Sequence, residues 1–155
     1  RDLGGAIVGL PNSGKSALLN ALTGASAPVA PYPRSTRDPA FGPIEDDLGN
    51  LFILGDLPGV DEQGEPRRDG RLRQIERAHL LIHCVDGREP DLIAERCALV
   101  RRGIAPFRSP GQPEIVVATF GDPASVPEGA DFAVDSQTGA GIAALRSAIL
   151  RRLTD

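Results

Sequence analysis

The sequence has little of what would place it in several protein classes. Its two cysteines, Cys84 and Cys97, are too few for a disulfide framework and lack the spacing of a metal site. No apolar run approaches the roughly 18 residues of a membrane span, and no signal peptide opens the chain. We therefore expect a reduced, cytoplasmic protein with buried thiols and no membrane partner.

Methionine is absent and lysine nearly so. Because there is no methionine and the chain starts at Arg1, we interpret the 155 residues as one domain excised from a longer protein. The net charge of −4 argues against a polyanion-binding surface as the main function. Of the 17 basic residues, only Lys15 is a lysine, and its position is the first to explain.

Short apolar runs alternate with amphipathic stretches, a pattern typical of a parallel α/β sheet. The expected strands cover residues 5–10, 40–46, 51–56, 80–86, 114–119 and 131–134. The expected helices cover residues 15–22, 69–79, 91–102 and 142–153. The short link at 47–50 fits an antiparallel hairpin. We predict a mostly parallel six-stranded sheet flanked by helices, with one antiparallel edge strand, in a single domain over residues 1–155.

The most specific motif runs from Gly9 to Ser16, GLPNSGKS, and fits G-x-x-x-x-G-K-[ST] between a strand and a helix. The backbone amides of such a loop cradle a phosphate, helped by the helix N-terminus. Lys15 would reach the β- and γ-phosphates, and Ser16 would ligate Mg²⁺. The alternative is a glycine-rich turn with an incidental lysine.

Two further segments suit the same chemistry. Asp56 and Gly59 form D-x-x-G at the carboxyl end of a strand, where ligands bind in open α/β sheets. Asp56 would hold Mg²⁺ through water, and the Gly59 amide would sense the γ-phosphate. Thr36, with Ser35 as competitor, would complete the Mg²⁺ shell from the long loop when triphosphate is bound. The alternatives are a strand-terminating turn and a solvated loop threonine.

Together these segments resemble a known family. GLPNSGKSALLNALTG, APYPRSTRDPAFG, DLPGV and LRQIERAHLLIHCVD, in this order, look like the G domain of the translation-factor-class (TRAFAC) GTPases. The nearest match is the Obg family, and the Era-type group with the tRNA-modifying GTPases comes second. The resemblance covers essentially the whole chain and implies the three-layer sandwich of P-loop NTPases.

The resemblance implies a GTP-binding, GTP-hydrolysing switch that uses Mg²⁺, with a slow intrinsic rate. It implies a role in ribosome assembly or RNA metabolism, with a ribosome or RNA partner bound through the switch loops. The catalytic residues would be Lys15, Thr36 and Gly59, and the metal ligands Ser16, Thr36 and Asp56. The nucleotide would be bound by Asn12, Ser13, Gly14, Lys15, Ser16, Ala17, Thr119, Phe120, Asp122, Ser136 and Gln137.

Asn12 matches an asparagine that coordinates K⁺ in several GTPases of this class, and such a cation would supply positive charge near the phosphates. The alternative is an asparagine chosen for its turn conformation. Val60 departs from the pattern of the Ras-like enzymes, which have a water-orienting Gln after the glycine. Water would therefore be positioned by a cation, the backbone or a partner.

The base-recognition motif N-K-x-D is altered to Thr119-Phe120-Gly121-Asp122. Asp122 would accept hydrogen bonds from guanine N1–H and N2–H₂, Thr119 would make fewer than Asn, and the Phe120 ring would stack where a lysine stem covers the base. We expect a guanine preference in weakened form. Only twelve residues separate Asp122 from Asp135, which is too few for the usual helix and strand.

Two rival functions remain at this stage. The altered base motif favours a degenerate G domain that binds nucleotide weakly or not at all and serves as an interaction module. A P-loop ATPase is disfavoured by Asp122 and by the switch-loop pattern. The two histidines, His79 and His83, lack an acidic partner in register, so we interpret them as core or surface residues.

Overall fold

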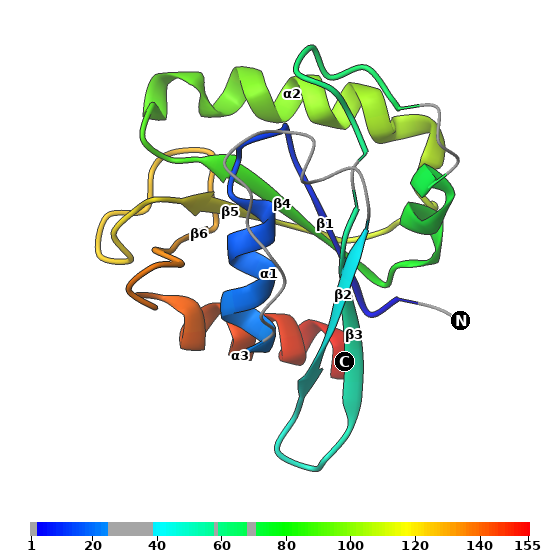
Figure 1. Cartoon of the computed structure of the whole chain (residues 1–155), viewed down its shortest axis with the longest axis vertical. Coiled ribbons are helices and arrows are strands. Elements are labelled where there is room, and N and C mark those ends of the chain that lie inside the picture. The colour runs from blue at the N-terminus through cyan, green and yellow to red at the C-terminus, as the bar shows by residue number, and fades with distance from the viewer. Residues whose placement is uncertain (1–2, 25–38, 58, 68–70) are drawn as a thin grey trace.

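The computed structural model describes residues 3–24, 39–57, 59–67 and 71–155, and it confirms the predicted fold class. The six strands form one sheet in the order β2-β3-β1-β4-β5-β6 (Figure 1). All neighbouring strands pair in parallel except β2 and β3, so the edge strand β2 is antiparallel as expected. The strands are β1 (Gly5–Val8), β2 (Ala40–Glu45), β3 (Leu51–Asp56), β4 (Leu80–Asp86), β5 (Glu114–Thr119) and β6 (Phe132–Ala133).

Besides the strands, the described residues form three α-helices and three 3₁₀ helices. The elements are α1 (Lys15–Thr23), α2 (Ile93–Ile104), α3 (Ile142–Thr154), η2 (Arg71–Arg77), η3 (Pro90–Leu92) and η4 (Ala105–Phe107). The helix expected at 69–79 is present as the shorter 3₁₀ helix η2. The buried residues Leu72 and Ile75 of η2, and Ala78 directly after it, follow one another at intervals of three, which suits the three-residue repeat of a 3₁₀ helix.

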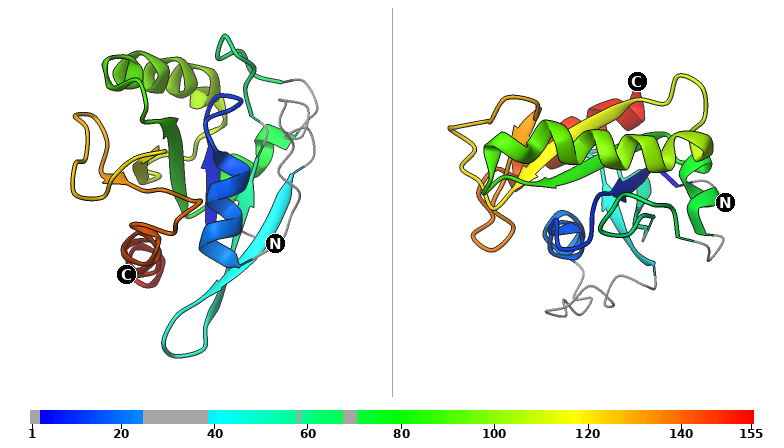
Figure 2. Two further views of the ribbon diagram at one scale, coloured as in Figure 1. Left: turned by 60° about the vertical axis from the view of Figure 1, so that its left-hand side comes forward. Right: turned by 90° about the horizontal axis from the view of Figure 1, so that it is seen from above.

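The helices cover both faces of the sheet. Figure 1 shows α2 on one side and α3 on the other, and Figure 2 turns the molecule to show the layers from two further directions. Leu18, Leu19 and Leu22 of α1 pack with Leu145 and Ile149 of α3 in one buried cluster. The opposite face is covered by α2 and η2. None of the helices in the described part of the chain has the length and apolar character needed to cross a membrane.

The connection from β5 to β6 lacks the helix that parallel crossovers usually contain, as the short spacing predicted. Residues 120–131 contain neither helix nor strand. The Gly121 amide donates a hydrogen bond to the Val134 carbonyl over 2.9 Å. This bond brings the end of β5 beside the loop that follows β6, so that the two segments predicted to contact a base lie together.

Candidate nucleotide-binding site

The loop between β1 and α1 has the backbone of a phosphate-binding turn. Asn12 and Gly14 both have positive φ angles, of 67° and 95°. Gly9 leaves no room for a side chain, because a Cβ there would overlap the Cys84 carbonyl oxygen. Gly14 caps α1 without a side-chain hydrogen bond. The first amides of α1 are therefore left to bind an anion, which the helix dipole also favours.

The loop is supported from beneath by two buried side chains. The Thr119 hydroxyl donates to the Ser13 carbonyl over 2.6 Å, and the Cys84 thiol donates to the same oxygen over 3.2 Å. Burial raises the pKa of Cys84 to about 12, so the thiol keeps its proton and remains a donor. Thr119 is 2% exposed. Its side chain faces the phosphate loop, whereas the sequence pattern had suggested a contact with the base.

Three polar side chains meet at the carboxyl end of β3. The Ser16 hydroxyl donates to Asp56 Oδ2 over 2.9 Å, and the Lys15 ammonium lies 3.9 Å from Asp56 Oδ1. Lys15 and Asp56 are both buried, with exposed side-chain fractions of only 2% and 3%. Burial raises the pKa of Asp56, while the positive charge of Lys15 and the Ser16 hydrogen bond oppose that rise.

This donor set fits a magnesium ion. Asp56 Oδ1 is buried and accepts no hydrogen bond from the described residues, and the neighbouring ligand is a hydroxyl oxygen. In the described part of the chain, no group of three or more His, Cys, Asp or Glu side chains could enclose a metal on its own. Mg²⁺ commonly binds through one or two protein oxygens together with phosphates and water, which agrees with such a sparse set.

The switch residues are only partly described. Thr36 and Ser35 lie outside the described residues. Gly59 is buried beside Leu72, and its carbonyl accepts a hydrogen bond from the Arg67 amide. Val60 is 2% exposed and belongs to the apolar cluster beneath α2. The side chain at this position is therefore packed into the core, which agrees with the absence of a water-orienting Gln.

The segment after Gly59 folds into a small turn that rests on α2. The Asp61 carboxylate accepts hydrogen bonds from the amides of Gln63 and Glu65, at 2.9 and 3.0 Å. The turn approaches α2 so closely that a Cβ at Gly103 would overlap the Gly64 carbonyl oxygen. This contact between two glycines was not predicted, because a lone Gly within a helical pattern does not reveal what lies against it.

The predicted base-contacting residues gather at the ends of β5 and β6. Phe120 is 39% exposed, and Asp122 is exposed with Oδ1 accepting a hydrogen bond from the Ala124 amide. The Ser136 hydroxyl is buried without a hydrogen-bond partner among the described residues. The Gln137 amide donates to Asp135, so its backbone donor is already used within the loop.

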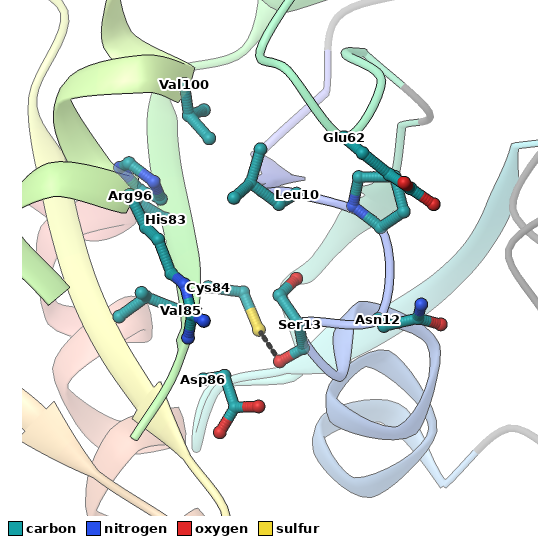
Figure 3. A pocket seen from close by; sticks show the side chains of 11 residues that line it. Leu10, Asn12, Ser13, Glu62, His83, Cys84, Val85, Asp86, Arg96 and Val100 are labelled. Atoms are coloured by element: carbon teal, nitrogen blue, oxygen red, sulfur yellow. Dashed lines mark hydrogen bonds between the residues drawn. The ribbon is translucent and has the colours of Figure 1, made fainter. Parts of the chain in front are cut away.

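A separate cleft of about 390 Å³ lies on the other side of the phosphate loop (Figure 3). Its walls come from the loop, the end of β4 and α2, and they include Asn12, Ser13 and Arg96. Lys15 and Asp56 do not line it. The cleft is therefore distinct from the place where the ammonium, hydroxyl and carboxylate converge.

His83, which also borders this cleft, has an acidic partner that the sequence did not reveal. Its Nδ1 lies 3.1 Å from Glu114 Oε2, and Arg101 and Arg108 bind the same carboxylate. Burial would raise the pKa of Glu114, but these hydrogen bonds and charges outweigh it and hold the pKa at about 2. The cluster joins β4 and β5 to the C-terminal half of α2.

Comparison with known proteins identifies the family. The sequence profile described as "50S ribosome-binding GTPase" matches residues 5–119. The chain belongs to this family. The GTPase Obg of Solibacter usitatus (strain Ellin6076) is 32% identical over 170 residues, which cover 95% of this chain and 50% of that protein. The GTPase Obg of Synechococcus sp. (strain RCC307) is 40% identical over 97 residues, covering 61% and 29%. The G domain thus spans half or less of the length of these relatives.

Solved structures share the fold of this G domain. Era, solved with MgGDPNP and nucleotides 1506–1542 of 16S ribosomal RNA, has a TM-score of 0.73 and 23% sequence identity, over 97% of this chain and 57% of Era. An NFeoB variant of S. thermophilus bound to GDP·AlF₄⁻ has a TM-score of 0.69 and 20% identity, over 98% and 64%. The family profile and the Obg relatives confirm a TRAFAC G domain near Obg, and the solved structures confirm its fold.

Proposed function

We propose that this G domain binds GTP and GDP together with Mg²⁺ and hydrolyses GTP slowly as a molecular switch. One observation carries the proposal: the Lys15 ammonium, the Ser16 hydroxyl and the Asp56 carboxylate converge beside the uncapped N-terminus of α1. Ammonium, backbone amides and a magnesium-binding oxygen pair are what phosphoryl transfer requires. Family membership supports the same activity.

Each residue of this cluster has a definite task. Lys15 presents a compact ammonium to the β- and γ-phosphates, which explains why the only lysine of the chain stands here. Ser16 and Asp56 hold Mg²⁺, with Thr36 as the proposed further ligand, and the Gly59 amide binds the γ-phosphate. Mg²⁺, when bound, neutralises charge on the phosphate oxygens.

Water must be positioned for in-line attack on the γ-phosphorus without a glutamine side chain. Val60 is buried and apolar, so it cannot orient water by a hydrogen bond. We assign this task to the backbone and to a K⁺ ion near Asn12, whose side chain is exposed at the rim of the loop. The left-handed backbone at Asn12 also supports a purely conformational role for this residue, so a K⁺ dependence of the hydrolysis rate decides between the two.

Guanine would be recognised mainly by Asp122, whose carboxylate accepts from N1–H and N2–H₂, and by stacking on Phe120. Ser136, in the loop after β6, would add its backbone amide and its buried hydroxyl. Because Thr119 is committed to the phosphate loop, the site lacks a polar contact that the usual Asn would add. A missing hydrogen bond costs roughly 1–3 kcal/mol, so we expect a weakened preference for guanine.

We propose a ribosomal subunit as the binding partner of this G domain. The family description names 50S ribosome binding, and the structure of Era contains a segment of 16S ribosomal RNA. We propose that the triphosphate-bound switch segments contact a ribosomal subunit. Co-sedimentation with purified subunits should be stronger with GDPNP than with GDP, and equal sedimentation in both states would refute a nucleotide-controlled contact.

Calorimetric titration with GDP, GTP and ATP, in Mg²⁺ with and without K⁺, tests the nucleotide assignment. We expect micromolar binding of guanine nucleotides and none of ATP. Lys15→Ala should abolish binding, and Lys15→Arg should weaken it strongly, because a planar guanidinium does not replace the compact ammonium. If no nucleotide binds the wild-type chain, the proposal fails.

A degenerate G domain is the second candidate, and the altered base motif together with the missing helix after β5 favours it. Measured GTP turnover separates the two, because a functional site hydrolyses GTP in the presence of Mg²⁺. A wild-type chain that binds GDP but shows no turnover would support the degenerate domain.

A further inference from the structure

Phe120 has an unusual backbone conformation at the base-recognition loop. Its φ angle is +57°, in the left-handed region that bulky side chains rarely adopt. Such strain persists only where the surroundings hold the residue in place, and it often marks a functional position. The ring is nevertheless 39% exposed, so apolar burial alone does not explain the conformation.

Arg88 holds the ring from one side. Its guanidinium carbon lies 4.0 Å from the centroid of the Phe120 ring, well within the range of a cation–π contact. The family resemblance gave no reason to single out Arg88. It comes from the segment after β4, which the Gly87 amide ties to the Thr119 carbonyl over 2.9 Å.

Asp86 fixes the direction of this guanidinium. Arg88 Nε donates to Asp86 Oδ1 over 3.1 Å, and Nη2 donates to Oδ2 over 2.8 Å, a two-point contact that orients the guanidinium plane. Burial opposes ionisation of Asp86, but the hydrogen bonds and charge of Arg88 outweigh it and hold the pKa of Asp86 below its ordinary value. Both charges are therefore present at neutral pH.

An aromatic ring has two faces, and the guanidinium covers one of them. The residue as a whole remains 39% exposed, and Asp122 lies two residues away. Bases stack on exposed aromatic rings in many nucleotide-binding proteins. We propose that Arg88 is a positioning residue for base recognition, which holds the Phe120 ring through its contact with Asp86 so that a purine base stacks on the free face.

This inference rests on the proposed nucleotide binding and adds that stacking and base selection depend on different residues. Stacking tolerates any purine, whereas hydrogen bonding to Asp122 selects guanine. Loss of Arg88 should therefore weaken GDP and IDP by the same factor, because IDP lacks only the 2-amino group. Asp122→Asn should instead change the ratio of the GDP and IDP affinities.

Competition titrations on the whole chain test the proposal with GDP, IDP and inorganic pyrophosphate as probes. We expect Arg88→Ala to weaken GDP and IDP by about two- to fivefold, the size of a cation–π contact at an exposed site, and to leave pyrophosphate unchanged, since pyrophosphate has no base. Arg88→Lys keeps the charge but not the two-point contact, so it should recover part of the loss. In a Phe120→Leu background, Arg88→Ala should have no further effect.

Three results would overturn the inference while leaving the proposed function intact. These are unchanged GDP affinity in Arg88→Ala, an equal loss for pyrophosphate, and a full loss that persists in the Phe120→Leu background. The second result would indicate general damage to the fold. If the wild-type chain binds pyrophosphate but neither GDP nor IDP, the proposed function fails, and this inference fails with it.

Discussion

Replacing Gly103 with alanine tests how the turn after Gly59 rests on α2. Within a helix, a change from glycine to alanine without new contacts stabilises by about 1 kcal/mol. Here the added Cβ would overlap the Gly64 carbonyl oxygen and lie 3.0 Å from Val60 Cγ1. The turn that follows Gly59 would have to move away from α2, and overpacking of this kind costs about 1–3 kcal/mol. We expect the overpacking cost to exceed the gain in helix propensity, so that Gly103→Ala lowers the free energy of unfolding.

Urea unfolding monitored by circular dichroism provides the measurement. Ala98→Gly, at an exposed position of the same helix, is the matched control and should cost about 1 kcal/mol through propensity alone. If Gly103→Ala raises the stability by the amount that Ala98→Gly lowers it, the turn does not contact α2 in solution. That result would refute the reasoning.

Three further substitutions test the site and its support. In the wild-type chain, GDP should bind more tightly in Mg²⁺ than in EDTA. Asp56→Asn should reduce this Mg²⁺-dependent increase in GDP affinity by about tenfold or more, and an unchanged increase would show that Asp56 is not part of the metal site. Thr119→Val should lower the unfolding free energy in urea by about 1–2 kcal/mol, because the Ser13 carbonyl loses a buried donor; a neutral effect would contradict the support of the loop by Thr119. Glu114 has a pKa of about 2 in the fold against 4.5 unfolded, so its stabilising effect is present above pH 4.5 and is lost as the pH falls towards 2. The stability deficit of Glu114→Gln in urea, roughly 3 kcal/mol at pH 7, should shrink across that window, and a constant deficit would contradict the ion-pair assignment.

The strands and the phosphate loop could be predicted because their signals are local. The run 51–56 and the run 114–119 agree with β3 and β5 residue for residue. The first strand was expected at 5–10 but ends at Val8, since Gly9 already approaches the backbone of β4. The order of the motifs along the chain then placed Lys15 and Asp56 at the same edge of the sheet.

Contacts between distant segments could not be predicted in the same way. His83 and Glu114 are 31 positions apart and meet only because β4 and β5 pair in a particular register. Thr119 stands where the family has a base-binding residue, and its shorter side chain bonds to the phosphate loop instead. Neither the pair nor the direction of the threonine hydroxyl leaves a signal in a single sequence.

The missing helix after β5 has a consequence for local opening. The outer edge strand β6 has two residues, and the Asp131 and Val134 amides bind β5 carbonyls at 2.8 and 2.9 Å. So short an edge strand separates from the sheet at a lower free-energy cost than a central strand, although opening it exposes the buried Ala133 and Val134. Amide hydrogens of residues 131–134 should therefore exchange with deuterated solvent well before those of β1 and β4, and a base bound beside Asp122 would slow that exchange.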